Sequence, residues 1–231
     1  MRGKEAPFAD AIILAAGDST RMEGQDKLLM EVGGLPLIAW TIRAAAKAKT
    51  VRRIIIVARA DRAEAIAGEP WIVDVDASVV IGGRRRQDSV AAGVDESDGE
   101  VVLIHDGARP LVTPTLLDRV ATTARAKGAA VPIVAVPESM RRVLNGRIVG
   151  SLDRTDLYRS QTPHGAQREV LMRAYASQDP RGPKTFIDET TLVQSAGISV
   201  STVLGEPTNL KVTLPGDEML AFALLAARAE D

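Results

Sequence analysis

Short β-prone runs alternate with longer amphipathic segments along most of this chain. The β-prone runs cover residues 12–14, 53–58, 79–81, 101–105 and 129–136, and the helical patterns between them cover residues 36–49, 62–67, 87–94 and 114–127. This order favours a mostly parallel sheet covered by helices on both faces. Ligands bind at the carboxyl ends of such strands, so the loops after Leu14, Ile81 and Ile104 are expected at one edge of the sheet.

One segment interrupts the alternation. Residues 140–152 are β-prone on both sides of Asn145-Gly146, which is a strong two-residue hairpin signal. A lone hairpin is marginal in water, so it should pack on a second copy of the chain or on its own surface. Further helices are expected at 167–176, 189–196 and 215–229, and a strand at 199–204. Without repeats or linkers, residues 1–231 are expected to form a single domain with an arm at about 137–160.

Composition excludes several classes of protein. The 231 residues include no cysteine and two histidines, which excludes disulfides, thiolate zinc sites and a histidine-rich metal centre. A net charge of −1 and 3% aromatic residues give no basis for binding nucleic acid. Residues 1–10 are polar and no apolar run reaches membrane-span length. We therefore expect no membrane partner, and we expect the protein to be located in the cytoplasm.

The first strand leads directly into a loop suited to a nucleoside triphosphate. Residues 11–27 read A-I-I-L-A-A-G-D-S-T-R-M-E-G-Q-D-K, so three residues with little side chain follow the strand. They allow backbone N–H groups to approach anionic oxygens, and Arg21 and Lys27 add two cations. The simpler alternative is a tight turn with two solvated cations. No Walker A or G-x-G-x-x-G pattern occurs.

A second candidate site is V-L-I-H-D-G-A-R-P, residues 102–110. Asp106 at the end of a buried strand is suited to Mg²⁺, which needs one or two carboxylates beside phosphate oxygens and water. The alternatives are that Asp106 caps a helix or pairs with Arg109. His105 is expected to be a satisfied, partly buried side chain and not a ligand.

Other polar residues are informative only as a group. Gly82-Gly83 allows close approach of a ligand, Asp88 or Ser89 can cap the helix that follows, and the arginines between them can add to phosphate or base binding. Ser139, Arg154 and Thr162, with Lys211 on an expected short strand at 209–213, supply cations and hydroxyls for a second phosphate.

Six motifs in order resemble one enzyme family. They are the loop at 14–27, the G-G…D-S of 82–89, the H-D-G-A-R-P of 105–110, Thr162-Pro163, Asp188-Glu189 and the N-L-K-V-T of 209–213. Together they resemble the 2-C-methyl-D-erythritol 4-phosphate cytidylyltransferases of the non-mevalonate isoprenoid pathway. The resemblance covers essentially the whole chain. It implies a Rossmann-like, three-layer α/β/α nucleotidyltransferase fold and transfer of CMP from CTP to methylerythritol 4-phosphate with Mg²⁺.

The resemblance also assigns roles. Arg21 and Lys27 match transition-state stabilisers, and Arg154 and Lys211 match residues that orient the acceptor phosphate; these four are the expected catalytic residues. The expected nucleotide-binding residues are Ala15, Ala16, Gly17, Gly82, Gly83 and Ser89. The expected substrate-binding residues are Asp106, Arg109, Ser139, Arg154, Thr162 and Lys211, with Asp106 also the metal ligand. The arm implies a homodimer in which some acceptor contacts cross between subunits.

Four positions depart from the family pattern. They are His164 in place of a usual glutamine, Ile187 in place of a common threonine, Gly107 in place of a frequent alanine, and Arg84 in place of an acidic residue. His164 and Ile187 keep a ribitol 5-phosphate cytidylyltransferase open as an alternative. A molybdopterin-type nucleotidyltransferase and a non-catalytic nucleotide-binding regulator are further alternatives.

Overall fold

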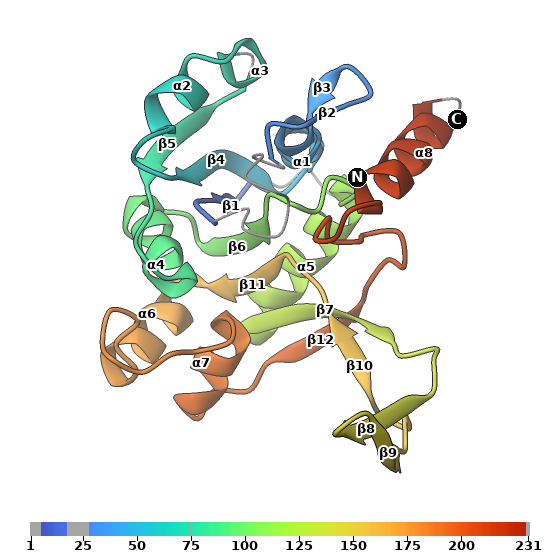
Figure 1. Cartoon of the computed structure of the whole chain (residues 1–231). Helices are drawn as coiled ribbons and strands as arrows, with labels where there is room; N and C mark the ends of the chain where they lie inside the picture. The colour runs from blue at the N-terminus through green and yellow to red at the C-terminus, as the bar shows by residue number, and fades with distance from the viewer. Residues whose placement is uncertain (1–5, 18–27, 74, 230–231) are drawn as a thin grey trace, which may run out of the picture.

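An eight-stranded sheet forms the centre of the computed structural model, which describes residues 6–17, 28–73 and 75–229 (Figure 1). The strand order is β10-β7-β11-β6-β1-β4-β5, with β12 also paired to β7. These strands are β1 (Ala9–Ala15), β4 (Val51–Ala58), β5 (Ala77–Ile81), β6 (Val101–Asp106), β7 (Ala129–Ala135), β10 (Tyr158–Ser160), β11 (His164–Gln167) and β12 (Ser201–Leu204). A separate pair consists of β2 (Glu31–Val32) and β3 (Leu35–Pro36).

The strands nearest the centre run parallel and end at the same edge. β1 pairs in parallel with β4 and β6, and β4 pairs in parallel with β5. Beyond their ends, the Gly107 N–H donates to the Leu14 carbonyl at 3.0 Å and the Gly82 N–H donates to the Ala58 carbonyl at 2.8 Å. The three loops expected at one edge therefore do lie together.

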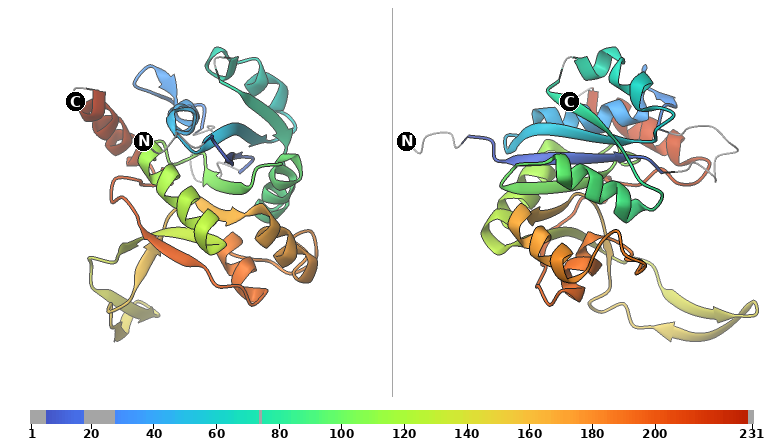
Figure 2. Two further views of the ribbon diagram at one scale, coloured as in Figure 1. Left: turned by 180° about the vertical axis from the view of Figure 1, so that it is seen from behind. Right: turned by 90° about the vertical axis from the view of Figure 1, so that its left-hand side faces the viewer.

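Helices cover both faces of the sheet, as expected for a three-layer fold (Figure 2). They are α1 (Leu37–Lys47), α2 (Ala63–Ala67), α3 (Pro70–Val73), α4 (Arg86–Glu96), α5 (Pro114–Lys127), α6 (Arg168–Ser177), α7 (Glu189–Ser195) and α8 (Asp217–Ala229). Side chains alternate along a strand, so Ile13 packs into the core beneath α1 and α5 while Ile12 packs into the core beneath α4, α6 and α7.

Helix α5 shows why the sequence predicted several boundaries well. The Thr113 side chain accepts a hydrogen bond from the Leu116 N–H at 3.0 Å, and Pro114 occupies the first helical position. Gly128, with φ of 92°, ends the helix in a conformation that other residues rarely adopt. The observed helix therefore has the bounds that the pattern predicted.

The expected hairpin is present as an arm. β8 (Met140–Leu144) and β9 (Arg147–Leu152) pair with each other, and Asn145 and Gly146 have φ of 50° and 73°, as a tight hairpin turn requires. The arm extends away from the rest of the structure (Figure 2, right). Its apolar side chains Val143, Leu144 and Ile148 are about three-fifths exposed, at 58%, 62% and 67%.

Two sequence predictions about local structure were wrong or incomplete. Residues 209–213 do not form a strand; the Val212 N–H donates to the Ala108 carbonyl at 2.8 Å in the loop after β6, which ties the segment to the site without a strand ladder. The short strand β11 was not foreseen; it runs antiparallel between β6 and β7. Among the described helices, none is long and apolar enough to cross a membrane.

Candidate active site

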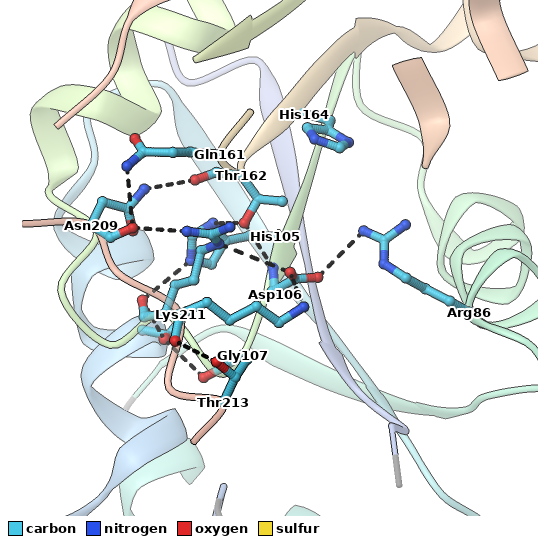
Figure 3. Close-up of polar contacts among 12 residues, drawn as sticks. Arg86, His105, Asp106, Gly107, Gln161, Thr162, His164, Asn209, Lys211 and Thr213 are labelled. Atoms are coloured by element: carbon cyan, nitrogen blue, oxygen red, sulfur yellow. Dashed lines mark hydrogen bonds and ion pairs between the residues drawn. The ribbon is translucent and has the colours of Figure 1, made fainter. Parts of the chain in front are cut away.

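Asp106 is the centre of a cluster of charged side chains at the carboxyl edge of the sheet (Figure 3). It is the last residue of β6, and its side chain is 12% exposed. Its Oδ2 lies 2.8 Å from Lys211 Nζ and 3.9 Å from Arg109 Nε, while its Oδ1 lies 3.3 Å from Arg86 Nη2. The structure thus brings together three of the predicted site residues, and Arg86 from the arginine run joins them.

The electrostatics of this cluster favour the ionised carboxylate. Burial by itself would favour the neutral acid, but the positive charges of Arg86, Lys211 and Arg109 outweigh it and hold the pKa of Asp106 well below its usual range. Lys211 is 39% exposed and Asp106 faces it. The site therefore presents a fixed negative charge surrounded by cations, which suits a ligand that carries both phosphate and metal.

His105 points to the opposite face of β6, because neighbouring residues of a strand alternate. It is fully buried, and its Nδ1 lies 3.0 Å from Thr162 Oγ1. The same hydroxyl oxygen accepts the Asp106 N–H at 3.1 Å. Burial lowers the pKa of His105 to about 4, so the ring is neutral. His105 is satisfied as expected, although it is fully and not partly buried, and the Thr162 hydroxyl fixes the end of β6.

Buried amide side chains position Lys211 and Arg109. Gln161 Nε2 donates to the Glu206 carbonyl at 2.8 Å, and Asn209 Nδ2 donates to the Thr162 carbonyl at 2.9 Å. The backbone carbonyl of Asn209 in turn accepts a hydrogen bond from Arg109 Nη1 at 2.8 Å. These bonds replace the strand pairing that was expected around Lys211. Sequence reasoning missed Gln161 and Asn209, although Asn209 begins the N-L-K-V-T motif.

The predicted nucleotide-binding residues form the rim next to this cluster. A Cβ added to Gly82 would lie 2.7 Å from Ala16 Cβ and 2.8 Å from Ser89 Oγ, so the ends of β1, β5 and the start of α4 are in close contact. The Gly83 N–H donates to Ser89 Oγ at 3.1 Å. Glycine at position 82 therefore lets the ends of these strands and the start of α4 pack closely together.

Four predicted residues are not among the described contacts of this cluster. Arg21 and Lys27 are outside the described residues. Ser139 and Arg154 lie at the base of the arm, where Arg154 donates to the Pro137 carbonyl. Neither belongs to the described partners of Asp106, which are the three cations and Thr162. Within the described part of one subunit, the arm residues therefore make no direct contact with Asp106.

The residues at this edge fit a magnesium ion whose other ligands come from a substrate. The described part of the chain holds no group of three carboxylate, histidine or cysteine side chains suited to a metal. Mg²⁺ in phosphate-transfer sites needs only one or two carboxylates, since phosphate and water oxygens complete its shell. Asp106 is ionised and lies at a strand end, so it can serve as that carboxylate.

An α/β sheet with a small-residue rim and an ionised aspartate beside it is the arrangement expected of an enzyme of the nucleotidyltransferase class. The chain belongs to the 2-C-methyl-D-erythritol 4-phosphate cytidylyltransferase (IspD) family, whose model matches residues 9–227.

Individual relatives agree with this assignment. The cytidylyltransferase of Cereibacter sphaeroides (strain KD131) is 38% identical over 226 residues, covering 95% of this chain and 97% of that protein. The bifunctional enzyme IspD/IspF of Desulfotalea psychrophila is 36% identical over 225 residues, covering 95% of this chain; the chain spans 57% of that longer protein. The crystal structure of the cytidylyltransferase from Thermus thermophilus superposes with a TM-score of 0.78 at 30% identity, covering 93% of this chain and 98% of that one.

Proposed function

We propose that this chain transfers CMP from CTP to 2-C-methyl-D-erythritol 4-phosphate and releases pyrophosphate, in the synthesis of isoprenoid precursors. The observation that carries this proposal is the family match over residues 9–227. The cluster of Asp106 with Lys211, Arg86 and Arg109 supports it, because a reaction between two anions needs such charges at a strand-end rim.

The chemistry requires alignment and charge neutralisation more than acid–base catalysis. An oxygen of the acceptor phosphate attacks the α-phosphorus of CTP, and the bond from that phosphorus to the bridging oxygen breaks as pyrophosphate leaves with the electron pair. Lys211 would hold the acceptor phosphate near Asp106, while Arg21 and Lys27 would neutralise the triphosphate. At about 4 Å and an effective dielectric constant near 20, each such contact contributes about 4 kcal/mol before desolvation.

Mg²⁺ is the proposed cofactor, held by Asp106. When bound, it would supply positive charge to phosphate oxygens. Asp106 would then keep the metal at the edge of the sheet, and Ala15, Ala16, Gly17, Gly82, Gly83 and Ser89 would hold the nucleotide. Arg109, fixed by the Asn209 carbonyl, would face the acceptor side.

A homodimer is proposed to complete the acceptor site. The arm at about 137–160 extends away from the rest of the structure with Ser139 and Arg154 at its base, and its apolar side chains are exposed. A second copy packed on the arm would cover those side chains and receive both polar residues.

We further propose that residues 1–231 act as one nucleotidyltransferase domain and that the protein is located in the cytoplasm.

Pyrophosphate release tests the proposed function. With CTP and Mg²⁺, release is expected with methylerythritol 4-phosphate at a kcat/KM at least about tenfold above that with ribitol 5-phosphate, since a well-fitted polar site rejects an analogue strongly. Preference for ribitol 5-phosphate would assign the chain to that acceptor instead. Absence of release with either acceptor, with CTP binding intact, would contradict the proposed transfer.

Lys27→Ala is expected to slow turnover by about 10²- to 10³-fold, by analogy with the loss of a donor to an oxyanion. The residue follows the first loop in a position that matches a transition-state stabiliser, so folding should change little. Turnover at saturating substrates and thermal unfolding are measured together. Lys49→Ala removes an equal charge from an exposed position just before the amino end of β4, at the edge of the sheet opposite to the site, and serves as control. Near-normal turnover of Lys27→Ala would refute the role of this lysine.

A further inference from the structure

Arg86 contacts two carboxylates from different parts of the chain. It is the first residue of α4, directly behind the Gly82-Gly83 rim. Its Nη1 lies 2.6 Å from Glu189 Oε1, and its Nη2 lies 3.3 Å from Asp106 Oδ1. Figure 3 shows the Asp106 side of this bridge. One planar guanidinium therefore joins the aspartate of the site to Glu189, which lies 103 residues after Arg86 in the chain.

Glu189 is a rigid anchor for this arginine. It is the first residue of α7 and is 6% exposed, and its second oxygen, Oε2, lies 3.0 Å from His164 Nδ1. Burial would favour the neutral acid, but Arg86 and His164 outweigh it and lower the pKa of Glu189. Both oxygens of an ionised, buried carboxylate are thus occupied, so Arg86 is held from behind at a fixed position.

The chain segment before Glu189 is also held by the first turn of α4. Gln87 Nε2 donates to the Pro180 and Lys184 carbonyls at 2.7 and 2.8 Å, and Gln87 Oε1 accepts the Phe186 N–H at 2.9 Å. Because Gln87 neighbours Arg86, the segment that carries Glu189 and the helix that carries Arg86 are fixed to each other. The contact from Arg86 to Asp106 is therefore made by a preorganised group.

We infer that Arg86 is a positioning residue that fixes the orientation of the Asp106 carboxylate. Lys211 contacts Oδ2 and Arg86 contacts Oδ1, so the two cations together oppose rotation of the carboxylate about its last side-chain bond. Without Arg86, the two remaining cations, Lys211 and Arg109, would both lie against Oδ2, and the ion pair to Oδ1 would be lost. This inference deepens the proposed function, on which the catalytic importance of Asp106 rests, and it assigns Arg86, Glu189 and His164 to the support of the site.

The test compares single and double variants. Arg86→Gln leaves Glu189 buried beside His164 alone and will lower stability, whereas Arg86→Gln with Glu189→Gln removes both charges and restores part of it. Both are expected to lose about tenfold to hundredfold in kcat, as for a small misplacement of a reacting group, with Kd for CTP little changed. Arg86→Lys is expected to recover part of kcat. A stable double variant with kcat within about threefold of wild type would show a purely structural role.

A matched control lies on the same segment. Arg181 pairs with Asp95 of α4 at 2.5 Å, but both side chains are half-exposed, so Arg181→Gln should change kcat by less than about threefold.

A thermal-unfolding cycle of Arg86→Gln, Asp106→Asn and their double variant tests the contact between Arg86 and Asp106 without measuring catalysis. If Arg86 and Asp106 interact, the Tm of the double variant should fall by less than the sum of the falls in the two single variants. Additive falls in Tm would overturn the inference. This readout stands even if the proposed transfer were to fail.

Discussion

Asp106→Asn is expected to reduce turnover by about 10²- to 10³-fold, comparable to the loss of a key electrostatic group from an active site. The substitution keeps the shape of the side chain but removes the charge that Arg86, Lys211 and Arg109 now surround. Three cations would then face a neutral amide, and the carboxylate proposed to hold the metal would be gone. Saturating turnover with CTP, acceptor and Mg²⁺ is the measurement.

Asp98→Asn is the matched control for this substitution. Asp98 also pairs with an arginine, Arg52, but its side chain is 78% exposed, so the pair is screened by solvent. Turnover and Tm should stay close to those of the wild type, because exposed ion pairs contribute about 0–1 kcal/mol. If Asp106→Asn retained turnover like that of Asp98→Asn, Asp106 would have no part in the reaction.

Local patterns in the sequence were sufficient to predict most of the strands and helices. The apolar run around Ile12 and Ile13 predicted a buried strand because its side chains alternate between two covered faces, and both are buried. Asn145-Gly146 predicted the hairpin because those residues accept positive φ, and the turn has it. In each case the decisive interaction lies within a few residues of the chain, so the pattern contains it.

Such local patterns could not predict the ion pairs that join Arg86 to Asp106 and Glu189. Arg86 could be read only as one of three arginines beside a rim, because its partner Glu189 is brought to it by the packing of α7 and the 179–189 segment against α4. Lys211 was placed near a phosphate but on the wrong local structure, since the side chains that hold its segment, Gln161 and Asn209, act over 45 residues or more. The D-E motif at Glu189 was the one available signal.

The free energy of unfolding is expected to fall by about 3 kcal/mol as the pH is lowered from 6.5 to about 4, because of His105. In the folded chain this ring is fully buried with a pKa of about 4, whereas in the unfolded chain it takes its ordinary value of 6.5. Between these values the unfolded chain binds the extra proton, so acid favours unfolding. Well above pH 6.5 the ring is neutral in both states and the contribution is fully retained.

Denaturant titrations at pH 7, 6 and 5 measure this dependence in the window above the range in which Asp106 and Glu189 begin to take up protons. His105→Gln keeps a polar group near Thr162 but cannot titrate, so its unfolding free energy should vary much less over these pH values. His164→Gln is the matched control, because it removes the other histidine but not the burial that is the main cause of the lowered His105 pKa; it should keep most of the pH dependence. Equal pH profiles for wild type and His105→Gln would mean that His105 is not held neutral within the fold, since a buried ring that resists protonation must link acid to unfolding in this range.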